Sequence, residues 1–220
     1  MSEPVQPPVQ QPAQQPAASI RLKICGLRLP EQAAAVAALG VDAIGVIGVA
    51  ASPRWLAPQQ RPELFAALAA VSPSCQGVLV VADPSDRELA ELDPERGHRI
   101  VQLHGQETPQ RCRQLRAQLG CPIWKALRLR RSADLAQVQA YADSVDALLL
   151  DAWQPDQLGG TGQRIPLEWL ADFAPPPASH QGSGVAAERV PARRLASRAG
   201  TRSAATPPAS HQGSGGAKSA

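Results

Sequence analysis

Five side chains whose types can move protons or bind charged groups follow apolar segments of this 220-residue chain. They are a thiol, a guanidinium, an imidazole, an ammonium and a carboxylate: Cys25, Arg54, His104, Lys125 and Asp151. Thiols, imidazoles and carboxyl groups serve as catalytic bases, acids and nucleophiles. Five such groups at the ends of successive apolar segments are not expected by chance, so we predict a functional site there.

Each of these residues also has an ordinary interpretation. Cys25 could be a small buried residue, and Arg54 could be a solvated loop charge. His104 could bridge backbone groups, and Lys125 could extend its ammonium out of the mouth of a barrel. Asp151 is the hardest to explain in this way, because a carboxylate that follows three leucines needs a partner or a function.

The elements that must position these groups are six apolar segments, each followed by a longer amphipathic one. The segments expected as strands are Ile20–Ile24, Asp42–Val49, Gln76–Ala82, Arg99–Leu103, Pro122–Leu127 and Asp146–Ala152. Strands that are apolar throughout and separated by helices predict a parallel sheet covered by helices. In such folds functional groups gather at the carboxyl ends of the strands, where the five candidates stand.

Two parallel architectures fit this order of elements, a doubly wound sheet and a (β/α)8 barrel. The first loop has no GxGxxG motif, which weakens the dinucleotide-binding form of the doubly wound sheet. The length from Ile20 to the end of the chain suits eight strand–helix units. We therefore favour an α/β fold of the (β/α)8 TIM-barrel type.

Composition divides the chain into three parts. Residues 1–18 form a Pro/Gln-rich arm that we expect to be disordered, residues 19–174 hold the six βα units, and residues 175–220 form a low-complexity basic tail. The segment PPASHQGSG occurs twice in the tail, at Pro176–Gly184 and Pro207–Gly215. The tail has too few apolar residues for two further βα units, so we expect units 7 and 8 to be degenerate or missing and the barrel to be incomplete.

Charge and cysteine usage exclude several classes of function. The formal net charge is +3, and after Phe173 six Lys/Arg residues stand against one Glu, so the rest of the chain is close to neutral. We therefore expect no nucleic-acid partner. No apolar run is long enough to cross a membrane, and residues 1–18 do not form a signal peptide. The four cysteines are far apart and form no CxxC pair, so we expect neither a metal site nor disulfides. Free cysteines in turn predict a cytoplasmic location.

A series of short motifs resembles the phosphoribosylanthranilate isomerase family of tryptophan biosynthesis. The motifs are KICGL (Lys23–Leu27), SPRW (Ser52–Trp55), VQLHG (Val101–Gly105), IWKAL (Ile123–Leu127), LLLDA (Leu148–Ala152) and GGTG (Gly159–Gly162). They follow one another with the family's spacing from about Arg21 to Phe173. The combination of KICGL with LLLD and GGTG is far more specific than any one motif.

The resemblance implies a (β/α)8 barrel and an aldose–ketose isomerase that uses no metal or organic cofactor. The implied reaction is the Amadori rearrangement of N-(5-phosphoribosyl)anthranilate, a phosphosugar, to the carboxyphenylamino-deoxyribulose phosphate. Cys25 matches the general base that removes the proton from C2′, and Asp151 matches the general acid that protonates the ring oxygen. Arg54 matches the arginine that holds the anthranilate carboxylate. A thiol with a free pKa of about 8.5 is only slightly ionised at neutral pH, so such a base must be locally tuned.

Further residues are expected to bind the substrate. We place His104 and Lys125 there, together with a flexible loop that covers the substrate, made of Gly159, Gly160, Thr161 and Gly162. The family binds phosphate with backbone amides of the loops after strands 7 and 8. Gly182 and Gly184 are the weak candidates for that role.

The atypical carboxyl-terminal end leaves alternatives to an active isomerase. Without strands 7 and 8 the barrel cannot close, so we expect poor solubility and little isomerase turnover. One alternative is an inactive remnant or a non-catalytic interaction module of the same fold. Another is a different phosphosugar barrel, such as an epimerase, which the missing metal-binding histidines and aspartates weaken. The oligomeric state stays open, because the family includes monomers, dimers and fusions.

Overall fold

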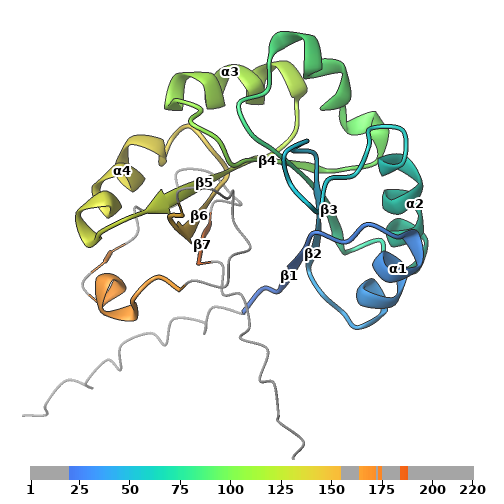
Figure 1. The fold of residues 1–220 in the computed structure, drawn as a ribbon, viewed down its shortest axis with the longest axis horizontal. Helices are drawn as coiled ribbons and strands as arrows, with labels where there is room; N and C mark the ends of the chain where they lie inside the picture. The colour runs from blue at the N-terminus through green and yellow to red at the C-terminus, as the bar shows by residue number, and fades with distance from the viewer. Residues whose placement is uncertain (1–19, 155–163, 172, 175–183, 188–220) are drawn as a thin grey trace, which may run out of the picture. The chain divides into compact units, whose positions relative to one another are not determined.

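Seven parallel strands form one sheet in the order of the sequence, from β1 to β7. The computed structural model describes residues 20–154, 164–171 and 173–174, and the backbone alone of residues 184–187. The strands are β1 (Lys23–Cys25), β2 (Ala43–Ile47), β3 (Gln76–Val81), β4 (Ile100–Leu103), β5 (Ile123–Leu129), β6 (Ala147–Ala152) and β7 (Gly184–Ala187). The strands lie along an arc in Figure 1. The six predicted strands and the parallel α/β fold are confirmed.

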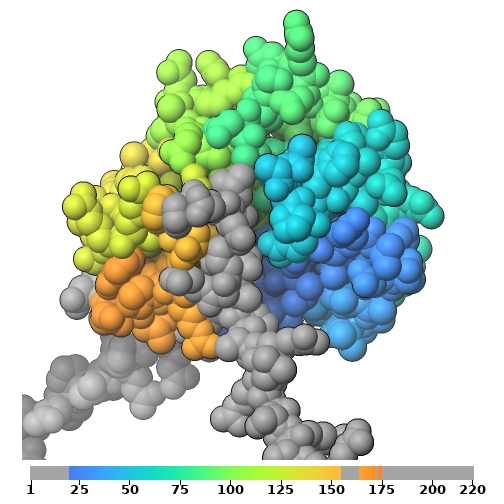
Figure 2. All heavy atoms as spheres, in the orientation of Figure 1, coloured from blue at the N-terminus to red at the C-terminus, as the bar shows by residue number. Residues whose placement is uncertain are grey.

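The helices lie along the outer side of this arc (Figure 1). The α-helices are α1 (Pro30–Ala38), α2 (Arg61–Val71), α3 (Pro109–Leu119) and α4 (Gln137–Tyr141). The 3-10 helices are η1 (Asp86–Glu91), η2 (Pro94–Arg96), η3 (Ser132–Ala136) and η4 (Leu167–Leu170). Proline in the first turn favours the start of α1, α2 and α3. In the space-filling view, the atoms of the blue to yellow segments pack against one another along this side (Figure 2).

Alternate residues of each strand pack into two different apolar layers, which define an outer and an inner face of the sheet. On the outer face, Ile44 and Leu103 belong to a large buried cluster that includes the helix residues Leu64 and Leu115. On the inner face, a smaller cluster is made of Ala43, Ile47, Val78, Val80 and Ile100, with Cys25, Val49 and Trp124 at its border. Because both faces are buried, the strands are apolar throughout, as a parallel sheet requires.

After β3 and β6, the longer amphipathic helix that we expect to follow each strand is replaced by shorter turns in the segments Asp86–Leu92 and Ile165–Phe173. Both segments contain 3-10 helices, η1 and η4, and neither of these has a buried residue. Helices in proteins are stabilised mainly by packing of an apolar face, so a segment without that contact forms only short turns. Pro94 also disfavours helical backbone at Asp93, which limits the first of them.

β7 is a strand that the composition of the tail did not predict. It pairs in parallel with β6, with Ala147 opposite Gly184 and Leu150 opposite Ala187. Backbone hydrogen bonds need no apolar side chains, so a short segment of small residues can extend a sheet. Among the described residues β1 pairs with β2 alone and β7 with β6 alone, so the described part of the barrel is open. The arm at residues 1–18 and the rest of the tail lie outside the described residues.

No helix in the part of the chain that the structure describes is long and apolar enough to cross a membrane.

Candidate active site

Three of the predicted site residues lie on the inner face, at the carboxyl ends of their strands. Cys25 is the last residue of β1, His104 follows β4, and Asp151 is the next-to-last residue of β6. Each shares its face with the residues two positions earlier, because side chains of a strand alternate between faces. The outer cluster takes Leu148 and Leu150 of β6, which leaves Asp151 on the inner side.

The side chain of Cys25 packs against the backbone of Gly45 on the neighbouring strand. The two residues are opposite each other in the parallel ladder. A Cβ atom at Gly45 would lie 2.5 Å from the Cys25 Sγ, which is closer than atoms pack. Glycine at this position therefore makes the space that the thiol occupies, and the thiol is held at the border of the inner cluster, half-buried.

Arg54 packs against the turn that follows Cys25. Its guanidinium donates a hydrogen bond from Nη1 to the Cys25 carbonyl oxygen at 3.4 Å. Gly26 adopts a φ of +89°, and a Cβ there would lie 2.7 Å from the Arg54 Cδ. The loop that carries Arg54 is fixed to β2 by the hydrogen bond from the Leu56 N–H to the Ile47 carbonyl at 2.9 Å. The positive φ and the close approach both require glycine after Cys25.

His104 and Asp151 contact each other across the end of the sheet. The His104 Nε2 lies 3.2 Å from the Asp151 Oδ2, and their side chains are 7% and 13% exposed. The His104 backbone N–H also donates to the Val81 carbonyl at 2.8 Å. A carboxyl group held by a single imidazole in a nearly buried position can exchange a proton with that ring, which suits an acid–base role.

Lys125 does not lie at the mouth of the barrel, where the sequence analysis placed it. β5 extends to Leu129, so Lys125 lies inside the strand. Its neighbours Trp124 and Ala126 are on the inner face, and the alternation of side chains therefore places Lys125 on the outer face. Its Nζ donates to the Gly105 carbonyl at 2.8 Å, the Glu107 Oε2 at 2.9 Å and the Ala126 carbonyl at 3.0 Å. All three protons are bound within the protein, so we remove Lys125 from the substrate-binding set.

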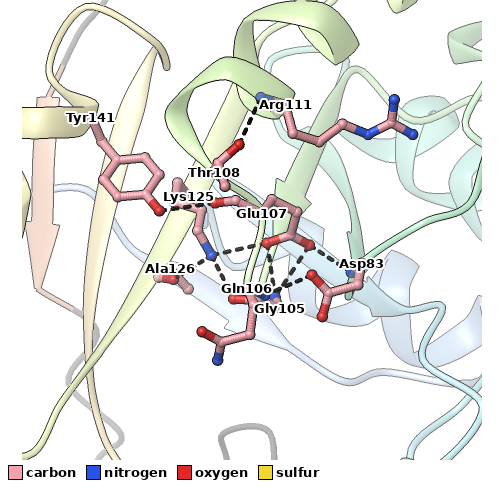
Figure 3. Close-up of polar contacts among 9 residues, drawn as sticks. All are labelled: Asp83, Gly105, Gln106, Glu107, Thr108, Arg111, Lys125, Ala126 and Tyr141. Atoms are coloured by element: carbon pink, nitrogen blue, oxygen red, sulfur yellow. Dashed lines mark hydrogen bonds and ion pairs between the residues drawn. The ribbon is translucent and has the colours of Figure 1, made fainter.

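The partner of Lys125 is a buried carboxylate, that of Glu107, at the centre of a polar network (Figure 3). The Glu107 side chain is 1% exposed and accepts hydrogen bonds from the N–H groups of Asp83 and Gly105. Tyr141 of α4 donates to the Glu107 carbonyl at 2.9 Å. This network fixes the loop that follows His104, so its role is to position the end of β4.

The remaining predicted site residues are not part of this geometry. Gly159, Gly160, Thr161, Gly162 and Gly182 lie outside the described residues. Gly184 begins β7 opposite Ala147, the first residue of β6, so it lies at the amino end of the strands and Asp151 at the carboxyl end. The phosphate loop of a barrel follows the strand, so this position does not suit Gly184 for phosphate binding.

Sequence reasoning missed three polar residues that alternation places on the inner face. Lys23 stands two residues before Cys25, Gln102 stands two residues before His104, and Arg128 is opposite Asp151 in the ladder. Among the described residues the Lys23 Nζ and the Gln102 Oε1 are buried without a hydrogen-bond partner. The period of two along a strand could have found Lys23 and Gln102, because it places each of them on the same face as a predicted site residue of its own strand. It could not have found Arg128, because the predicted site residue of β5 is Lys125, three positions earlier and on the other face.

The other three cysteines are buried, whereas Cys25 is half-buried. Burial raises the pKa of the Cys75 thiol and raises the pKa of the Cys112 and Cys121 thiols to about 11. All four cysteines are free. The described residues contain no group of three or more His, Cys, Asp or Glu side chains that could hold a metal ion.

Comparison with sequence families gives a match over most of the chain. A sequence model of the family described as N-(5'phosphoribosyl)anthranilate (PRA) isomerase matches residues 22–179. The N-(5'-phosphoribosyl)anthranilate isomerase of Synechocystis sp. is 43% identical over 159 residues, which cover 72% of each chain.

Solved structures give the same result. The phosphoribosyl anthranilate isomerase of Thermus thermophilus superposes with a TM-score of 0.55 at 30% identity, covering 69% of this chain and 70% of that one. A second phosphoribosyl anthranilate isomerase, solved in complex with reduced 1-(o-carboxyphenylamino)-1-deoxyribulose 5-phosphate, superposes with a TM-score of 0.53 at 22% identity. This second superposition covers 62% of this chain and 66% of that chain.

Proposed function

This chain belongs to the phosphoribosylanthranilate isomerase family of tryptophan biosynthesis, and we propose that Cys25 and Asp151 are the base and the acid of its reaction. The observation that supports this most is their placement: both end strands of one sheet on its inner face, and Arg54 packs against Cys25. Acid and base on different strands can act on different atoms of one substrate.

The proposed reaction begins at Asp151. Its carboxyl proton passes to the ribose ring oxygen while the bond from that oxygen to C1′ breaks, and the nitrogen lone pair forms the C1′=N double bond. His104 keeps the carboxyl group in place through the 3.2 Å contact. Loss of a proton to the leaving oxygen requires that this group be protonated when the substrate is bound, which exclusion of water from the site favours.

Cys25 then removes the proton from C2′. The electron pair of that C–H bond forms the C1′=C2′ double bond, and the C1′=N electrons return to nitrogen, which gives the enol form of the product. Arg54 holds the anthranilate carboxylate as a bidentate cation, so the C2′ hydrogen stays beside the thiolate. The substrate class is a phosphosugar, and the carboxyphenylamino-deoxyribulose phosphate in the second solved relative is a reduced form of the corresponding product.

A second candidate, a non-catalytic remnant of the same fold, is favoured by two observations. Among the described residues β1 and β7 each pair with one strand only, and the family match ends at residue 179. The part of the family barrel that binds phosphate would follow β7. The residues that we propose as acid and base are thus among the described residues, while the segments expected to bind phosphate are not.

Growth of a tryptophan auxotroph that lacks its own isomerase tests the proposed function. We expect the chain to support slow growth and the Cys25→Ser and Asp151→Asn variants to support none. Failure of the unaltered chain at the same expression level would favour the remnant. Equal growth with Cys25→Ser would remove Cys25 from the mechanism.

The proposal also includes the setting of the enzyme. Four free cysteines support a reducing cytoplasm, because paired cysteines are typical of oxidising compartments. The absence of any cofactor remains a prediction from the family resemblance.

A further inference from the structure

Lys23 carries a buried ammonium group that the fold does not use. Its Nζ is buried and has no hydrogen-bond partner among the described residues. Burying an ammonium group without a partner costs free energy, so natural proteins rarely keep one without a function. Lysines are among the residues least often buried, which makes the position of Lys23 informative.

The side chain of Lys23 lies beside the thiol of Cys25. Both residues belong to β1, and their side chains occupy the same face. A Cβ atom at Gly45 would lie 2.5 Å from the Cys25 Sγ and 3.2 Å from the Lys23 Cε. The two side chains therefore pack against the same point of β2, and the bare backbone of Gly45 makes room for both.

We propose that Lys23 is an activating residue whose ammonium group stabilises the thiolate form of Cys25. This inference rests on the proposed function, in which Cys25 is the base. The thiolate takes the C2′ proton, the thiol that forms is neutral, and the ammonium is again without a counter-charge. A positive charge within about 4–6 Å of an acidic group favours its ionised form, and it commonly lowers the proton affinity of that group about tenfold or more.

Other charged groups face Cys25 as well, and they do not replace Lys23. β2 and β3 place only apolar residues and Gly45 on the inner face near the thiol. Arg54 lies against the Cys25 backbone, but in the proposed complex its charge is bound to the substrate carboxylate. His104 and Asp151 hold each other on β4 and β6. Asp42, at the amino end of β2, is bound to the Leu22 N–H at 2.7 Å. Arg128, the inner-face cation of β5, is opposite Asp151 in the ladder. Among the described residues, Lys23 is thus the cation on the strand of Cys25 itself that the proposed complex leaves unbound.

Alkylation by iodoacetamide measures this effect without any turnover. The thiolate is the reactive species, and Cys75, Cys112 and Cys121 are buried with raised pKa values, so peptide mass spectrometry can follow Cys25 at neutral pH. In Lys23→Met we expect the alkylation of Cys25 at pH 7 to slow about tenfold. Ethylammonium added to Lys23→Ala is expected to restore part of the rate.

Arg21→Met is the matched control, because Arg21 is an exposed cation two residues earlier in the chain. It removes the same charge, and we expect the alkylation rate at pH 7 to change by less than about twofold, since solvent screens exposed charges. Equal slowing in both variants, or no slowing in Lys23→Met, would overturn the role of Lys23. If alkylation slows as expected in Lys23→Met while the unaltered protein shows no isomerase turnover, the proposed function fails and the charge coupling stands.

Discussion

The ammonium groups of two lysines of the same sheet are both buried, and they differ in what surrounds their charges. Lys125 on the outer face binds all three of its protons to protein oxygens, and one of these belongs to the carboxylate of Glu107. Lys23 on the inner face has none of these contacts among the described residues. A buried ammonium group whose protons are all hydrogen-bonded stabilises the fold. A buried ammonium group without a partner indicates a site where a negative charge forms during function. The same sheet thus separates a structural face from a chemical face.

The largest expected effect is on the structural face. Lys125→Met leaves the Glu107 carboxylate buried without its cation, and removing one partner of a buried ion pair typically costs about 3–5 kcal/mol. We expect the free energy of unfolding, measured in urea, to fall by that amount. The control is the double variant Glu107→Gln/Lys125→Met, which removes both charges and is expected to lose much less. Equal losses in the single and double variants would show that the ion pair itself does not hold this loop.

Gly45→Ala is expected to have an intermediate effect, because it crowds the chemical face. The added Cβ would overlap the Cys25 Sγ, so the thiol or β2 must move. Overpacking of this kind costs about 1–3 kcal/mol, and here it also displaces the proposed base. Gly40→Ala separates crowding from backbone strain. Nothing lies within 4 Å of the Cβ position of Gly40, so alanine there meets no neighbour, but the φ of +80° strains its backbone. Unchanged Cys25 alkylation in Gly45→Ala would contradict the tight fit.

Lys23→Met is expected to change stability in the opposite direction from Lys125→Met. Removing an ammonium group that has no partner relieves its desolvation, so the free energy of unfolding should stay constant or rise by about 1 kcal/mol. Thermal unfolding followed by circular dichroism measures this at pH 7. A loss of 2 kcal/mol or more would mean that Lys23 has a structural partner, and the contrast between the two lysines would disappear.

The smallest expected effect concerns His98, a buried polar group of the structural face. Its Nε2 lies 2.9 Å from the Leu92 carbonyl and its ring packs on Phe65, and burial lowers the pKa of this imidazole below its ordinary 6.5. The unfolded chain then binds a proton more readily than the folded one. Stability is therefore fully present above about pH 6.5 and is lost as the pH falls toward the lowered pKa. Unfolding at pH 7 and pH 5.5 should differ less in His98→Gln than in the unaltered protein.

Much of the fold could be predicted from the sequence, because the apolar strands and proline-started helices are local features. Cys25, His104 and Asp151 could also be placed, since each ends a strand and the carboxyl ends of parallel strands meet at one edge. The face of the sheet on which Lys125 lies could not be predicted. Apolar residues occupy both faces of β5, so the sequence around Ile123 and Trp124 shows no alternation of apolar and polar residues. β7 was missed for a related reason: its pairing with β6 depends on backbone hydrogen bonds, which composition does not record.

The lack of a partner for the Lys23 ammonium among the described residues could not be predicted from the sequence, because it depends on tertiary packing. The sequence places it two residues before Cys25, but its environment depends on Gly45 of the neighbouring strand and on the curvature of the sheet. Alternation alone identifies the face of such a residue. Only the packing of three residues on two strands shows that its charge has no partner among the described residues.

Steady-state turnover of N-(5-phosphoribosyl)anthranilate by the purified protein tests the central claim most directly, that the chemical face of this open sheet carries a working acid–base pair. We expect kcat/KM to lie far below that of a complete family barrel, because the sequence that follows β7 does not resemble the family's phosphate-binding segments. We also expect Cys25→Ser and Asp151→Asn each to lower the remaining kcat/KM by at least about a hundredfold, the effect of losing a positioned acid or base. Turnover equal to that of a complete barrel, or a loss of less than about tenfold in either variant, would contradict the account.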